Sequence, residues 1–178
     1  MSRRLHIGGT QTVEGWEVLN ALPGPAVDHI GNANDLSRFA DGTFAELYAS
    51  HVVEHLDYAG ELLATLKEWL RVLPAGGLLK VSVPNLDVLA QLFLARDQLT
   101  PDERFMVMRM MFGGHIDQYD YHQVGLNEEF LASYLFSAGF TNIRRVAGFG
   151  LFNDTSTMLF KGVPISLNLI AERPHVTP

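Results

Sequence analysis

The stretch from residue 45 to residue 84 constrains the fold of this chain more than any other part of the sequence. It begins with Ala45–Ser50, an apolar run with the length of a buried strand. Apolar residues then recur at three- and four-residue spacing from Leu62 to Leu73, as on one face of a helix, until a Pro-Ala-Gly-Gly sequence ends the pattern. A second strand, Leu78–Val83, follows. These patterns predict two parallel strands joined by a helix.

Polar residues follow the first of these strands directly. They form the pentad His51-Val52-Val53-Glu54-His55, of which Glu54 and His55 are expected to open the following helix. In parallel α/β units, ligands bind beyond the carboxyl ends of the strands. The pentad is therefore predicted to lie where binding or chemistry takes place.

The remaining sequence predicts further strands and helices around this unit. Strands are expected at Arg3–Ile7, Trp16–Leu19, Val27–Ile30, Ile143–Val146 and Pro164–Glu172, and helices at 86–94, 101–112 and 128–138. About eight residues separate the first two strands, whereas a crossover helix needs a dozen or more. Either a loop replaces the first helix, or one of these strands is misassigned.

Length and composition indicate one globular unit. With 178 residues, the chain suffices for one full hydrophobic core but not for two ordinary domains, so residues 1–178 are expected to form a single domain. Apolar residues make up 47% and charged residues 19%, which is typical of a globular rather than a disordered chain. The absence of cysteine excludes disulfides, thiolate metal sites and a cysteine nucleophile.

Charge and hydropathy indicate which classes of partner this chain can bind. A net charge of −7 without a basic run argues against nucleic acid, and no apolar segment is long enough to span a membrane. The basic N-terminus is followed by too few apolar residues for a signal peptide. We therefore expect a cytoplasmic protein with a small-molecule substrate and with no nucleic-acid or membrane partner, and we leave a homodimer open.

The order of motifs resembles a known enzyme family. A strand followed by Gly8-Gly9, then FADGTFAELYASHVVEHL and EWLRVLPAGGLLKVSVPNL, is similar to class I S-adenosylmethionine-dependent methyltransferases of the small type 11 group. MFGGHIDQYDYHQVG and PISLNLIAER resemble a subgroup of predicted methyltransferases associated with surface-polysaccharide assembly. The resemblance implies a Rossmann-like, doubly wound, mostly parallel sheet with helices on both faces and an antiparallel C-terminal strand.

The resemblance also implies S-adenosylmethionine as cofactor. The positions that match cofactor-binding positions of the family are Gly8, Gly9, Asn20, Asn32, Ala33, Ser50 and His51. Glycines after the first strand allow the main chain to approach a ligand closely. Asn20 and Asn32 stand where the family usually has acids, and Thr10 where it has a further glycine. These departures leave a second hypothesis open, a catalytically degenerate methyltransferase-fold binding protein.

Candidate catalytic residues are His55 and His122. The resemblance to the surface-polysaccharide subgroup implies a small hydroxyl-bearing acceptor such as a sugar or nucleotide sugar. If methyl transfer is to oxygen, a histidine of near-neutral pKa can remove the hydroxyl proton. Residues 112–126 include several histidines and aspartates and are expected to form a loop on the substrate side.

A zinc hydrolase is a further, weaker alternative. The pentad matches the H-x-x-E-H pattern, in which two histidines on one helical face bind zinc. Because the pentad follows a strand directly, His51 is expected at a turn and out of register with His55. No metal ligand is therefore assigned from the sequence.

Overall fold

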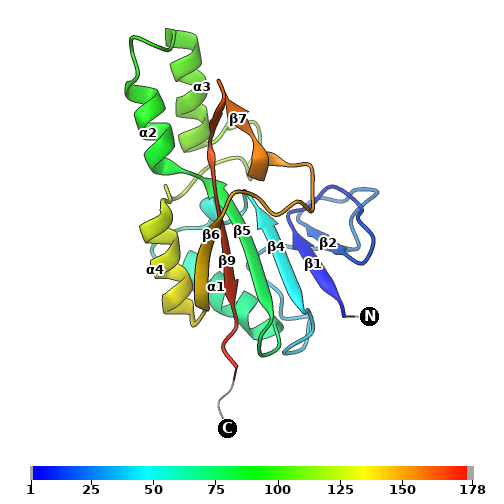
Figure 1. The fold of residues 1–178 in the computed structure, drawn as a ribbon. Coiled ribbons are helices and arrows are strands. Elements are labelled where there is room, and N and C mark those ends of the chain that lie inside the picture. Colours follow the sequence, from blue (N-terminus) through cyan, green and yellow to red (C-terminus); the bar gives the residue numbers. More distant parts are fainter. Residues whose placement is uncertain (1, 176–178) are drawn as a thin grey trace.

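The structure is a computed structural model that describes residues 2–175. Its centre is a seven-stranded sheet with the strand order β3-β2-β1-β4-β5-β9-β6 (Figure 1). The strands are β1 (Arg4–Ile7), β2 (Glu17–Asn20), β3 (His29–Ile30), β4 (Glu46–Ser50), β5 (Leu78–Pro84), β6 (Thr141–Val146) and β9 (Ser166–Glu172). In this sheet, β9 runs antiparallel to its neighbours β5 and β6, and the other pairs of neighbouring strands are parallel. The predicted α/β fold class with an antiparallel C-terminal strand is confirmed.

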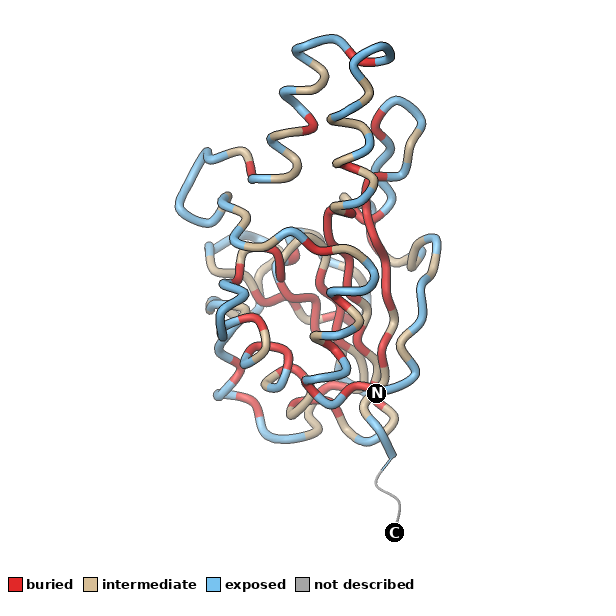
Figure 2. The backbone as a smooth tube through the Cα atoms, turned by 90° about the vertical axis from the view of Figure 1, so that its left-hand side faces the viewer, coloured by how far each residue is buried: buried red, intermediate tan, exposed pale blue. Residues whose placement is uncertain are grey.

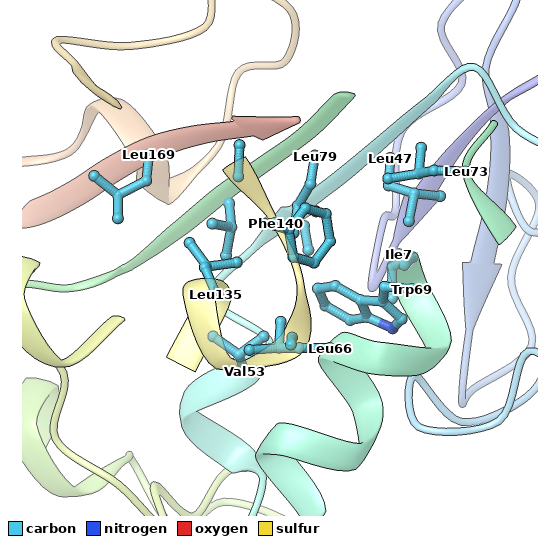
Figure 3. Packing of buried hydrophobic residues seen from close by; sticks show 14 of the residues in the cluster. Ile7, Leu47, Val53, Leu66, Trp69, Leu73, Leu79, Leu135, Phe140 and Leu169 are labelled. Carbon is cyan, nitrogen blue, oxygen red and sulfur yellow. The ribbon is translucent and has the colours of Figure 1, made fainter. Parts of the chain in front are cut away.

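Two amphipathic helices cover one face of the sheet. They are α1 (Glu61–Val72) and α4 (Glu128–Ala138), which contact each other. Leu47 of β4 and Leu79 of β5 point toward these helices and pack with Trp69 of α1 and Leu135 of α4 in the main core (Figure 3). This layer buries the apolar stripe that the sequence predicted for residues 62–73.

The second face differs from the expectation of helices on both sides. Its buried cluster consists of Trp16, Tyr48 and Phe152, with Phe149 and Leu151 packed against them, and all of these belong to strands or loops. The connection between β1 and β2 is a loop, because its residues are too few for a crossover helix. A loop in place of the first helix was one of the two alternatives left by the sequence.

His6 projects from β1 into this second face and is only 4% exposed. Its ring centroid lies 4.0 Å from that of Phe152 and 4.9 Å from that of Tyr48. Burial lowers the pKa of His6 to about 4, although the carboxylate of Asp154 acts in the opposite direction. The folded protein therefore holds this ring neutral at pH values where an unfolded chain would protonate it.

This burial predicts a pH-dependent stability. Above pH 6.5 the ring of His6 is neutral in both the folded and the unfolded chain, and its burial contributes fully to the free energy of unfolding. This contribution is lost as the pH falls from 6.5 toward 4, because the unfolded chain then binds a proton that the folded protein does not. In this window the contribution of His6 should fall by about 3 kcal/mol. Urea unfolding at pH 7 and pH 4 should show a smaller pH-dependent loss for His6→Phe than for the unaltered protein. Equal losses in the two proteins would contradict this assignment.

A smaller unit rises beyond the carboxyl ends of the strands. It contains α2 (Leu86–Leu94), α3 (Pro101–Phe112) and the hairpin β7 (Leu159–Phe160) and β8 (Val163–Pro164) (Figures 1 and 2). Residues of α2, α3 and β7 share a separate apolar cluster. The predicted cap of α3 is confirmed, since the Thr100 side chain accepts a hydrogen bond from the Glu103 main chain. No helix within residues 2–175 has both the length and the apolar character of a membrane span.

Candidate functional site

A pocket of about 390 Å³ lies at the carboxyl ends of β1, β2 and β4; we call it the sheet-edge pocket. Five of the seven predicted cofactor positions line it: Gly8, Asn20, Asn32, Ala33 and His51. The two others do not line it. Gly9 packs against the ring of His6, where a Cβ atom would lie 2.6 Å from the ring. The hydroxyl oxygen of Ser50 is buried and has no hydrogen-bond partner within residues 2–175.

Gly8 presents bare main chain to the sheet-edge pocket. Its φ is +76°, and a Cβ atom at this position would lie 2.6 Å from Cγ2 of Val52. Its N–H donates to the Leu19 carbonyl at 2.8 Å, which fixes the turn after β1. Both the conformation and the close approach require glycine.

Asn20 ends β2 and holds the neighbouring loop. Its Nδ2 donates to the Gly9 carbonyl at 2.9 Å, and its Oδ1 accepts from the Leu22 N–H at 2.9 Å. A carboxylate could not donate the first of these bonds. The asparagine at this position therefore has a structural use that an aspartate could not replace.

Glu61 and Tyr119 also line the sheet-edge pocket, and Glu61 was not predicted as a site residue from the sequence. Glu61 opens α1, and its carboxylate accepts from Nδ2 of Asn34 at 2.7 Å and from the Asp57 N–H at 3.1 Å. Its place at the first position of a helix beyond a strand end is the signal that could have identified it. Tyr119 comes from the loop predicted to lie on the substrate side.

A second pocket of about 310 Å³ lies between this loop, α3 and residues 155–165, which precede β9; we call it the cap pocket. Its polar lining consists of Arg109, Asp120, His122 and Thr155 together with His51. Because His51 also lines the sheet-edge pocket, the two pockets adjoin at this side chain.

His51 has a left-handed backbone, with φ of 54°. Burial lowers its pKa to about 3; charges on His122 and His55 act in the same direction, and Asp154 opposes them. Its Nε2 lies 2.9 Å from Oγ of Ser166. The side chain is thus a neutral, fixed ring at the junction of the two pockets.

Glu54 lies behind this junction and is 1% exposed. It belongs to η1 (Val53–His55), one turn of 3-10 helix, and α1 begins only at Glu61 with Gly60 as its N-cap. The expectation that Glu54 and His55 open the following helix was therefore wrong, because a separate turn intervenes. Neither carboxylate oxygen of Glu54 has a hydrogen-bond partner in the part of the chain that the structure describes, and burial raises the pKa of Glu54 to about 8.

His55 and His122 meet beside Glu54, with ring centroids 4.9 Å apart. The loop is tethered here because the Gln123 N–H donates to the Glu54 carbonyl at 2.7 Å. Burial, followed by the charge of His55, lowers the pKa of His122. His51 lies outside η1, so the single-helix H-x-x-E-H arrangement of the zinc-hydrolase alternative is not formed.

Comparison with known proteins supports the fold assignment. The sequence matches no protein-family profile, and it matches no curated protein. Among solved structures, it is similar to a SAM-dependent methyltransferase from Archaeoglobus fulgidus, with 16% identity, a TM-score of 0.62 and coverage of 96% of this chain and 86% of the other. A SAM-dependent methyltransferase from Methanosarcina mazei has 16% identity and a TM-score of 0.58 over 98% of this chain and 93% of the other.

A third similar structure is PigF, solved with SAH. It has 14% identity and a TM-score of 0.56 over 97% of this chain and 56% of the other. These neighbours, the strand order and the antiparallel β9 agree with one another. The chain therefore has the fold of class I S-adenosylmethionine-dependent methyltransferases.

Proposed function

We propose that this protein is an S-adenosylmethionine-dependent methyltransferase. The observation that carries the proposal is a pocket of small-molecule size at the strand ends, walled by the bare main chain of Gly8 and adjoining a second polar pocket. When bound, S-adenosylmethionine would supply an electrophilic methyl group on a sulfonium. The task of the chain is then to hold a donor and an acceptor beside each other.

The residues of the sheet-edge pocket fit this cofactor. Asn20, Asn32 and Ala33 would hold its adenosine part, and Gly8 and His51 its amino-acid part, as the family resemblance implies. At Gly8, the positive φ and the 2.6 Å between an added Cβ atom and Cγ2 of Val52 leave no room for a side chain, so this wall of the pocket stays bare main chain.

The cap pocket would hold the acceptor, for which we propose a small hydroxyl-bearing molecule such as a sugar or nucleotide sugar. Arg109, Asp120 and Thr155 offer both donors and acceptors to hydroxyl groups. Nδ1 of His122 lies 3.2 Å from the Met111 carbonyl, which leaves Nε2 to accept a proton. His122 and His55 are the residues that we propose for proton transfer, with the loop 112–126 as the cover.

Isothermal titration calorimetry with S-adenosylhomocysteine tests the cofactor directly. The Asn32 side chain lines the pocket, so Asn32→Ala should weaken binding about tenfold, the loss of roughly 1.4 kcal/mol, and leave the unfolding midpoint unchanged. Gln91→Ala, an exposed change on α2, is the matched control and should bind like the unaltered chain. Absence of heat at millimolar ligand with the unaltered protein would refute the proposed function.

A catalytically degenerate binding protein is the second candidate, motivated by Asn20 and Asn32, which stand where the family usually has acids. The two hydrogen bonds of the Asn20 amide argue against decay at this position. Asn20→Asp places a carboxylate against the Gly9 carbonyl and should cost about 1–3 kcal/mol of unfolding free energy without improving cofactor affinity. Urea unfolding of this variant measures the loss of stability, and calorimetry measures its affinity for the cofactor. A large gain in affinity would instead indicate a decayed cofactor pocket and favour the degenerate protein.

A further inference from the structure

We propose that Glu54, His55 and His122 form a binding site for a divalent transition-metal ion between the two pockets. One ligand atom from each of these side chains, a carboxylate oxygen and two ring nitrogens, can be chosen so that all three lie within 4.8 Å of one another. Two imidazoles and one carboxylate are a donor set that zinc and other first-row divalent ions accept. The metal site does not depend on the proposed methyl transfer.

The first observation is the unpaired carboxylate. Glu54 is 1% exposed, and neither of its oxygens has a hydrogen-bond partner among residues 2–175. A buried carboxylate without partners is costly, and proteins that retain one normally pair it with a cation. The residues that face Glu54 are histidines, and no lysine or arginine forms an ion pair with it in the described part of the chain.

The second observation is the orientation of the two rings. Nδ1 of His55 lies 3.1 Å from the Tyr121 carbonyl, and Nδ1 of His122 lies 3.2 Å from the Met111 carbonyl. A carbonyl only accepts, so each Nδ1 carries the hydrogen and each Nε2 carries a free lone pair. Histidines that bind metals usually donate their other N–H to a carbonyl or carboxylate in this way.

The third observation concerns His51. The Ser166 hydroxyl donates to the Thr155 carbonyl at 2.8 Å, so it accepts from Nε2 of His51. Nδ1 of His51 then carries a lone pair, 3.4 Å from Oε1 of Glu54. The two lone pairs face each other, so a proton or a cation must lie between them. A metal ion beside Glu54 would take the place of the proton that burial otherwise keeps on this carboxyl group.

The location suggests what the ion would bind besides the protein. His55 lines the sheet-edge pocket and His122 lines the cap pocket. Three protein ligands leave at least one coordination position open. We assign this position to a hydroxyl or carboxylate oxygen of the molecule in the cap pocket, an assignment that rests on the proposed function.

Titration of chelator-treated protein with Zn²⁺ and Co²⁺ tests the site without any assay of activity. The unaltered chain should bind one ion, show the visible absorption of coordinated Co²⁺ and melt at a higher temperature with Zn²⁺. Glu54→Gln and His122→Gln should each weaken binding at least about tenfold. His115→Gln, an exposed change in the same loop, is the matched control and should bind like the unaltered protein.

Two results would overturn the proposal: no saturable binding of either ion, or equal affinity in His122→Gln and the unaltered protein. His122→Gln changes a partly buried ring in a loop, so this variant still tests the metal site if Glu54→Gln fails to fold. Binding of S-adenosylhomocysteine, measured on the same samples, separates the two proposals. If the protein binds the ion but not S-adenosylhomocysteine, the metal site is retained and the methyltransferase proposal is rejected. If it binds S-adenosylhomocysteine but not the ion, the metal site is rejected and the methyltransferase proposal is retained.

Discussion

Replacing Gly8 with valine is expected to reduce affinity for S-adenosylhomocysteine by at least about a hundredfold, the equivalent of roughly 3 kcal/mol. A β-branched residue at φ of +76° is strained, and its Cβ atom would start 2.6 Å from Cγ2 of Val52. The turn after β1 must then move. Because Gly8 in this turn lines the sheet-edge pocket, the shape of the pocket changes as well. Calorimetry gives the affinity, and urea unfolding gives the accompanying loss of stability.

Gly150→Val is the matched control for this prediction. Gly150 also has a positive φ, +65°, but a Cβ atom there meets nothing within 4 Å. Gly150→Val should therefore lose only the stability that a β-branched residue costs at a positive φ, and its affinity for S-adenosylhomocysteine should be unchanged. The double variant Gly8→Ala with Val52→Ala should bind more tightly than Gly8→Ala, because the contact with Cγ2 is removed. Unaltered affinity in Gly8→Val would show that the ligand does not lie against this turn.

Trp69→Ala is expected to lower the free energy of unfolding by about 3–5 kcal/mol. Trp69 is fully buried between α1 and the sheet, where Ile7 lies beside it (Figure 3). Its Nε1 also donates to the Ala33 carbonyl at 2.8 Å, and Ala33 lines the sheet-edge pocket. Loss of the ring should therefore weaken cofactor binding as well as the fold.

Two further variants separate these effects. Trp69→Phe keeps an aromatic ring but leaves the Ala33 carbonyl without its donor, so affinity should fall with a smaller loss of stability than in Trp69→Ala. Trp16→Ala removes a buried indole from the second face and should lower stability without changing affinity. If Trp69→Phe binds S-adenosylhomocysteine normally, the hydrogen bond to Ala33 does not shape the pocket.

Local signals account for the parts of the fold that the sequence predicted well. The run Ala45–Ser50 became β4, the helical stripe became α1, and Thr100 capped α3, because side-chain periodicity and capping depend on neighbours a few residues apart. The separate turn η1 was missed. Its three residues are too short to show any periodicity, so the pentad was attached to the helix that follows.

The candidate site also contains residues that the sequence could place and residues that it could not. Gly8, Asn20 and His51 could be placed at one edge by sequence alone, since each follows a predicted strand and parallel strands end together. The loop contacts of Glu54 could not be placed, because they join segments far apart in the chain through the Gln123 N–H and the ring of His122. Short-range patterns in the sequence thus determined most of the strands and one wall of the pocket, whereas the order of the strands in the sheet came from the structure. Only the tertiary structure decided that a buried, unpaired carboxylate faces three histidines, because packing rather than pattern removes water from that position.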